Sequence, residues 1–279
     1  MIGFVHIMTL PFLTCLILAG IYTYLGLHVI EREVIFVDLA LAQIAALGAS
    51  IALVIGVSIE SGCSYWISLG FTIIGATIFS LTRFRKQRIP QEAIIGITYA
   101  VSAALLILVL SRSGEGDEHI KQALVGNILL IAPYEALRVL IISLAVGVFH
   151  FLYRKKFLLI SQDPEEALRK GLNIKLFDFL FYVSLGLVVT SSVRIAGVLL
   201  IFTFLIVPAA CAMLFSNTIK TRLMLGWFIG FLASILGLVA SYYMDLPTGA
   251  SIVCTFGVML IAMSLIKTFI PNSIKQKSN

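Results

Sequence analysis

Long apolar runs follow one another along almost the whole chain, separated by short polar connections. Each run has about 18–24 residues, the length that an α-helix needs to cross a bilayer. The bilayer core holds no water to bond the backbone N–H and C=O groups, so a spanning run is expected to be a helix, which satisfies them internally. The pattern predicts an all-α, polytopic membrane protein with about nine transmembrane helices in one domain over residues 1–279. The predicted spans are residues 5–27, 35–58, 64–82, 93–111, 135–153, 176–193, 195–216, 223–243 and 249–269.

Composition agrees with this class of protein. Of the 279 residues, 60% are hydrophobic and only 12% are charged, against about 25% charged in an average soluble domain. The net charge of +6 comes from basic residues in short connections between spans, where they act as topology signals. We therefore expect a membrane protein with no nucleic-acid partner.

Basic residues collect in every second connection. They occur in residues 83–88, 154–175 and 220–222 and in the C-terminal segment 267–277. With nine spans, all four segments fall on the same side, which the positive-inside rule makes cytoplasmic. The chain is predicted to be integral to the cytoplasmic membrane, with the N-terminus outside and the C-terminus in the cytoplasm.

One cytoplasmic connection contains the signals of a short, well-capped helix. Ser161 or Asp163 can cap its start, Pro164 fits its first turn, and Gly171 ends it. Acidic residues near the start and basic residues near the end suit the helix dipole. Two spans can be joined without such a helix, so we expect it to dock a cytoplasmic partner. The predicted docking residues are Asp163, Pro164, Glu165, Glu166, Ala167, Leu168, Arg169 and Gly171.

Residues 124–132 form a different kind of connection. They are too apolar for a solvated loop and too few to span a membrane. We expect a short helix that packs against the external mouth of the bundle.

Asp38 lies near the start of the apolar run 35–58. An ionisable residue inside a span is costly, so it indicates a functional site. Its carboxylate either offers an oxygen ligand to a passing cation or forms an interfacial pair with Arg32. His28, ten residues earlier, is a second candidate metal ligand.

Pro208 lies inside the run 195–216, where proline removes a backbone hydrogen bond and kinks a helix. The kink is either a gating hinge or a static packing feature.

Several stretches of the chain form a recognisable series, at residues 91–100, 126–131, 163–172, 193–200, 205–210 and 245–250. Together, and in this order, they resemble one family, the membrane permeases of ATP-binding-cassette importers for divalent metals such as zinc and manganese. The resemblance implies a homodimeric permease that moves zinc, manganese or iron and has no covalently bound cofactor. It also implies ATPase subunits docked at the 163–171 helix, and an extracytoplasmic metal-binding protein that delivers the cargo.

The chain departs from the family at one motif. Typical members carry Asp-x-x-Ser-His in the second span, and the Asp and His line the metal path. Asp38 matches the Asp, whereas Leu41 and Ala42 occupy the Ser and His positions. Gln43 does not replace the His, because a fifth residue is rotated by about 140° from Asp38 on a helix.

No motif predicts catalysis in this chain. It contains no Walker-type phosphate-binding loop, no H-E-x-x-H motif and no recognisable nucleophile–base pair. We expect that it is not an enzyme and that ATP hydrolysis belongs to the partner subunit.

Two alternatives to bare-metal import remain open. Because the His is missing, the same architecture would also suit a metal chelate or a cobalamin-like compound. The other alternative is an ATP-independent secondary transporter or channel. We expect no further acidic residues of a proton relay inside the spans, which argues against that alternative.

Overall fold

The computed structural model describes residues 2–58, 61–83, 89–111 and 126–269. Within these ranges no strand occurs, and nine helices are long and apolar enough to cross a membrane. They are α1 (Ile2–Glu31), α2 (Val37–Val54), α3 (Gly62–Leu81), α4 (Gln91–Leu110), α6 (Pro133–Leu152), α9 (Ile174–Ala196), α10 (Val198–Phe215), α11 (Ile219–Met244) and α12 (Thr248–Phe269). The predicted fold class and number of spans are confirmed.

The predicted spans differ from these helices only at their ends. α2 ends at Val54 rather than at residue 58, because Gly56 adopts a φ of 86°, a conformation that terminates helices. Two of the basic segments behind the predicted orientation, 83–88 and 267–277, lie partly outside the described residues, at positions 84–88 and 270–277.

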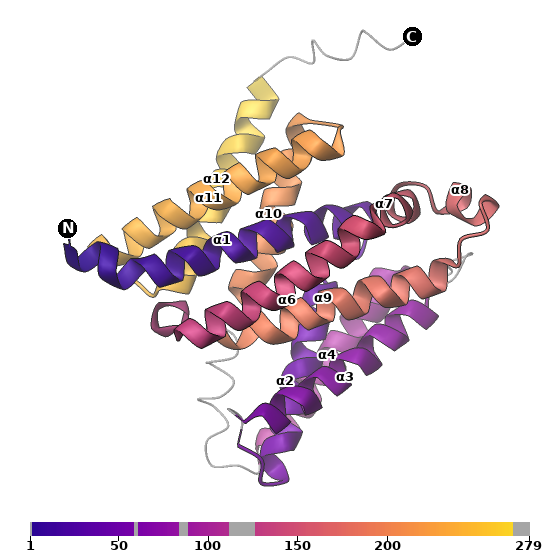
Figure 1. Ribbon diagram of the computed structural model, residues 1–279, viewed down its shortest axis with the longest axis horizontal. Coiled ribbons are helices and arrows are strands. Elements are labelled where there is room, and N and C mark those ends of the chain that lie inside the picture. Colours follow the sequence, from indigo (N-terminus) through magenta and orange to yellow (C-terminus); the bar gives the residue numbers. More distant parts are fainter. Residues whose placement is uncertain (1, 59–60, 84–88, 112–125, 270–279) are drawn as a thin grey trace.

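The spanning helices form two groups joined by a central set (Figure 1). In one group α2 packs against both α3 and α4, and in the other α10, α11 and α12 pack against one another. Helices α1, α6 and α9 lie between the groups. α1 packs on α10 and α11, α9 packs on α3, and both contact α6.

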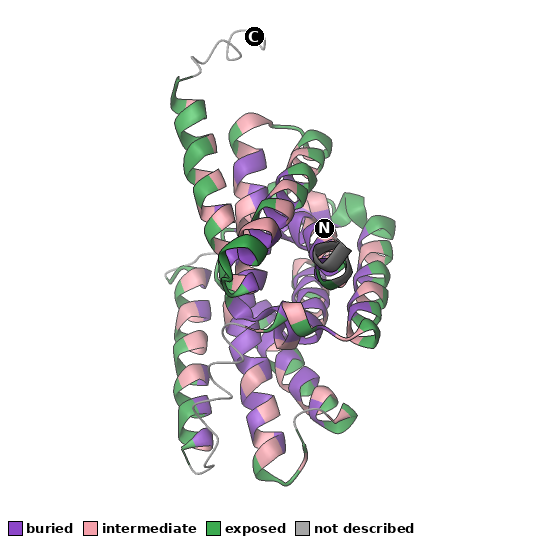
Figure 2. Cartoon of the chain, turned by 90° about the vertical axis from the view of Figure 1, so that its left-hand side faces the viewer, coloured by how far each residue is buried: buried purple, intermediate pink, exposed green. Residues whose placement is uncertain are grey.

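Burial follows this arrangement (Figure 2). α9, α1 and α2 bury the largest share of their spans, and α12, α4 and α6 bury the smallest. The exposed faces are apolar, with Ile97 and Leu108 on α4 and Ile261 and Leu265 on α12. Apolar side chains on the outside of a helix suit contact with lipid or with another apolar helix.

Glycines set how closely α1 approaches its neighbours. A Cβ atom on Gly26 would lie 1.8 Å from the carbonyl oxygen of Leu205, so only glycine allows α1 to rest on α10 here. A Cβ atom on Gly226 of α11 would lie 2.4 Å from Thr23 of α1. Small residues at such contacts are typical of membrane helices that pack closely.

The helix predicted over residues 124–132 is a single 3₁₀ turn, η1 (Ile128–Leu130), and residues 124 and 125 lie outside the described ranges. It packs against α1 and α12. The Asn127 N–H donates to the Ile195 carbonyl at 2.9 Å. Gly126 has a φ of 63°, and a Cβ atom there would lie 2.3 Å from the backbone of Ala196. The apolar turn is thus held against the end of α9 by backbone contact.

The connection between α6 and α9 contains two helices, α7 (Arg154–Gln162) and α8 (Pro164–Arg169). α8 confirms the helix predicted over residues 163–171, whereas α7 was not predicted. Asp163 is both the C-cap of α7 and the N-cap of α8. The two helices therefore share one junction, and we call the part of the molecule that carries them the α8 end.

Candidate functional site at the α8 end

α8 is fixed at both ends and exposes a charged surface. The Glu166 N–H donates to Asp163 Oδ1 at 2.8 Å, so Asp163 is the cap and Ser161, the other candidate, is buried. Gly171 follows the helix with a φ of 74°, as glycine commonly does at this position. Ala167 is buried and anchors the helix. The exposed docking candidates are Asp163, Glu165, Leu168, Arg169 and Gly171, and the half-buried ones are Pro164 and Glu166.

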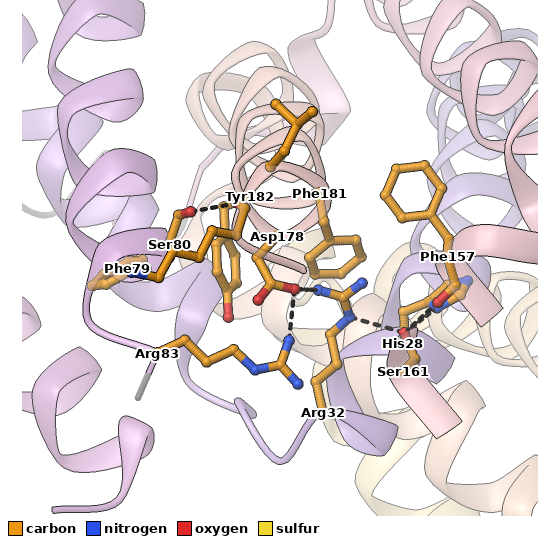
Figure 3. A network of polar contacts seen from close by, with 12 residues as sticks. His28, Arg32, Phe79, Ser80, Arg83, Phe157, Ser161, Asp178, Phe181 and Tyr182 are labelled. Carbon is orange, nitrogen blue, oxygen red and sulfur yellow. Dashed lines mark hydrogen bonds and ion pairs between the residues drawn. The ribbon is translucent and has the colours of Figure 1, made fainter. Parts of the chain in front are cut away.

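One carboxylate oxygen at the start of α9 joins two arginines (Figure 3). Asp178 Oδ1 lies 2.6 Å from Arg32 Nη1 and 2.6 Å from Arg83 Nη1. Arg32 belongs to the α1–α2 connection, Arg83 follows α3, and Asp178 lies in the first turns of α9. The side chains of Arg32 and Asp178 are fully buried. A single buried charge cluster therefore joins three of the spanning segments.

Ser161 links this cluster to α7. Its Oγ donates to the Phe157 carbonyl at 2.9 Å and accepts from Arg32 Nε at 2.9 Å. It also lies 2.8 Å from His28 Nδ1. A serine hydroxyl has a single proton to donate, so His28 Nδ1 carries a proton and donates to Ser161 in this arrangement. His28, predicted as a metal ligand, is here a hydrogen-bonding member of the network.

A second histidine lies next to His28. The ring centroids of His28 and His150 are 6.3 Å apart, and the Tyr24 ring packs against both, with centroid distances of 4.8 and 5.5 Å. His150 Nε2 is 2.7 Å from Ser184 Oγ. The other ring nitrogen of His150 and the Tyr24 hydroxyl are buried without hydrogen-bond partners. Among the described residues, however, no three His, Cys, Asp or Glu side chains gather to hold a metal ion.

Asp38 lies in the first turn of α2 and is 1% exposed. It does not pair with Arg32, whose guanidinium contacts Asp178. A second carboxyl group, that of Glu92 of α4, reaches the start of the same helix. Glu92 Oε1 accepts from the Phe36 N–H at 2.9 Å, which holds α4 at the start of α2. Asp38 Oδ1 and Glu92 Oε2 are both buried without hydrogen-bond partners.

Several of these residues were not found by sequence reasoning. The expectation that the spans hold no further acidic residue is wrong, since Asp178 is buried in α9. Its position two residues inside the run 176–193 was the signal that could have found it. Glu92 and Ser161 gave no comparable signal, because each lies at the end of an apolar stretch where polar residues are common.

Pro208 lies within α10, which runs without a break from Val198 to Phe215. It is buried, and a Cβ atom on Gly226 of α11 would lie 3.3 Å from its carbonyl oxygen. Whether it acts as a hinge stays a prediction.

The fold and the buried network define an integral membrane protein whose ionisable side chains gather at one end of the bundle, beside a short exposed helix. Buried charges inside membrane spans are characteristic of transport proteins. The chain belongs to the ABC 3 transport family, whose model matches residues 5–267.

Named relatives and a solved structure agree with this family. "Manganese transport system membrane protein MntC" of Listeria monocytogenes is 31% identical over 197 residues, covering 68% of this chain and 70% of that protein. "Manganese import system permease protein ScaB" of Streptococcus gordonii is 26% identical over 260 residues, covering 92% and 90%. PsaBC from Streptococcus pneumoniae, solved in complex with Fab, contains a chain with the same fold. It superposes with a TM-score of 0.78 at 24% identity and covers 97% of this chain and 96% of that chain.

Proposed function

We propose that this protein is the membrane-spanning permease subunit of an ATP-binding-cassette importer that moves a divalent metal ion, with manganese as the first candidate cargo. Membership of the ABC 3 transport family over residues 5–267 is the observation that carries the class. The names of the MntC and ScaB relatives support manganese. The chain serves as one transmembrane domain and leaves ATP hydrolysis to a separate subunit.

The cation path passes Asp38 and Glu92. Asp38 and Glu92 each keep one buried carboxyl oxygen without a hydrogen-bond partner, and a divalent cation bound to both oxygens would supply the missing partner. Oxygen ligands suit manganese better than they suit softer metals. Glu92 thus supplies the second ligand that Ala42 does not, and His28 remains in the hydrogen-bonded network outside the path.

α8 docks the ATPase subunits and faces the cytoplasm. Its exposed residues Glu165, Leu168 and Arg169 offer charges of both signs around an apolar side chain, which suits a specific protein contact. This orientation puts the N-terminus outside and the C-terminus in the cytoplasm. The opposite end receives cargo from an extracytoplasmic metal-binding protein, and Pro208 acts as a hinge of the gate.

A second copy of the chain completes the path. Each protomer supplies only the carboxylates of Asp38 and Glu92, whereas manganese takes six oxygen ligands in octahedral sites. A homodimer with both Asp38–Glu92 pairs at its centre would offer four carboxylates, and water would fill the remaining positions.

Uptake of radioactive manganese into proteoliposomes that hold the permease with its ATPase and binding protein tests the proposal. Asp38→Ala should abolish uptake while the ATPase still co-purifies. A charge reversal of α8, Glu165→Lys with Arg169→Glu, should instead abolish co-purification. Normal uptake by Asp38→Ala would remove that residue from the path, and retained ATPase binding by the α8 variant would contradict the docking assignment.

A further inference from the structure

We propose that Arg32 is a positioning residue that connects the docking helix α8 to the cation-path helix α2. It contacts the α8 side through Ser161, is held to α9 by Asp178, and leads to α2 through the backbone of the α1–α2 connection. This inference rests on the proposed function, in which α8 docks the ATPase and α2 carries Asp38. It adds the mechanical link between the two.

The first step of the link runs from α8 to Ser161. Asp163 caps both α7 and α8, and Ser161 lies two residues before it. Ser161 is buried and makes hydrogen bonds to Phe157, Arg32 and His28. A displacement of α8 against the bundle is therefore passed to the end of α7, and Ser161 is the residue that carries it inside.

The second step is the guanidinium of Arg32. It donates from Nε to Ser161 and from Nη1 to Asp178, and its carbon lies 4.1 Å from the centroid of the Phe181 ring. The planar fork binds two partners in fixed directions. Ser161 and Asp178 therefore cannot move apart without breaking a charge-assisted hydrogen bond.

The third step leads from Arg32 to α2. Arg32 lies in a tight connection between α1 and α2, where Glu33 has a φ of 57°, a conformation that few non-glycine residues adopt. The Val34 N–H bonds back to Val29, and the Val37 N–H bonds to Val34. The connection is thus held by its own backbone, and movement of Arg32 shifts the first turn of α2, where Asp38 lies.

The end of α1 is also fixed to α11. Glu31, the neighbour of Arg32, lies 2.5 Å from Arg222 in the first turn of α11. Adjacent residues therefore bind different helices, Glu31 binding α11 and Arg32 binding α9. A force on Arg32 turns the end of α1 about its contact with α11 and does not move the whole bundle.

The charge cluster has unused hydrogen-bonding capacity that allows a second arrangement. Arg32 Nη2 and Asp178 Oδ2 are both buried without partners, although an arginine–carboxylate pair can form two parallel hydrogen bonds. Arg83 occupies the same Oδ1 atom that Arg32 uses. A small shift lets Arg32 and Asp178 pair through both oxygens while Arg83 moves away, so the cluster can alternate between two states.

The test measures metal moved per ATP hydrolysed in the reconstituted complex. Ser161→Ala removes the α7 link, Asp178→Asn removes the α9 link, and Arg32→Lys keeps the charge but loses the fork. Each should lower the ratio roughly tenfold, as expected for loss of a charge-assisted hydrogen bond, while ATPase co-purification is retained. Lys155→Met, on the exposed face of α7, is the matched control and should leave the ratio unchanged.

The double variant separates coupling from simple destabilisation. If Ser161 and Asp178 act through the same guanidinium, the double variant loses no more than the worse single variant. Additive losses, or a wild-type ratio in Ser161→Ala, would overturn the proposal. If Asp178→Asn does not assemble, Ser161→Ala with Arg32→Lys gives the same comparison.

Failure of this inference can be told apart from failure of the proposed function. If the charge-reversed α8 variant still binds the ATPase, the docking assignment fails whatever Ser161→Ala does. If that variant loses the ATPase and Ser161→Ala still couples normally, docking stands and the link through Arg32 is wrong.

Discussion

Glu92 of α4 reaches the start of α2, where Asp38 lies, and each of the two residues keeps one carboxylate oxygen buried without a hydrogen-bond partner. Glu92 uses its other oxygen to accept the Phe36 N–H. Glu92 Oε1 therefore holds α4 at α2, and Glu92 Oε2 is the oxygen that the proposed function assigns to the cation.

Glu92→Gln separates these two roles, because the amide oxygen of Gln can still accept the Phe36 N–H while the negative charge is lost. We expect the manganese concentration for half-maximal uptake to rise about tenfold, which corresponds to about 1.4 kcal/mol. Uptake measured across manganese concentrations checks this. Glu92→Ala should in addition loosen α4 from α2, and an unchanged half-maximal concentration in Glu92→Gln would exclude the free oxygen from the path.

Two glycines of α1 provide a matched test of helix packing. A Cβ atom on Gly26 would lie 1.8 Å from the Leu205 carbonyl oxygen, whereas one on Gly20 meets nothing within 4 Å. Gly26→Ala should force α1 away from α10 and cost about 3 kcal/mol, which lowers the melting temperature in detergent by on the order of 10 °C. Gly20→Ala should stay within about 1 kcal/mol of the wild type. Equal melting temperatures for the two variants would contradict the packing of α1 on α10.

The spans and α8 could be predicted from the sequence because their causes are local. Apolar length defines a span, and the cap at Asp163 and the glycine at position 171 define a short helix within a few residues. The buried network has no such local cause. Arg32 and Asp178 are 146 positions apart, and nothing near either residue indicates the other. α7 was missed because its first turn, Arg154 to Lys156, is basic and matches a topology signal as well as a helix.

Asp178 and Glu166 allow a comparison of buried and exposed ion pairs. Asp178→Ala leaves two arginines without their shared carboxylate, one of them fully buried, and loss of one partner of a buried pair costs about 3–5 kcal/mol. Glu166 and Lys170 form a pair at 2.6 Å whose side chains are 46% and 59% exposed, and such pairs contribute less than about 1 kcal/mol. Thermal unfolding in detergent should therefore show a large loss for Asp178→Ala and almost none for Glu166→Gln. Similar losses in both would show that Arg32 and Arg83 find other partners.

Pro208→Ala decides between a gating hinge and a static packing feature in α10. Proline in a helix interior is about 3 kcal/mol less favourable than alanine, so the substitution favours a straight, fully hydrogen-bonded α10. If α10 bends at Pro208 during transport, the variant must overcome that preference, and a barrier raised by 3 kcal/mol would slow the step by roughly two orders of magnitude. We expect ATPase binding to remain normal while manganese uptake falls. Uptake at the wild-type rate, with an unchanged melting temperature, would show that Pro208 only fills the buried contact beside Gly226.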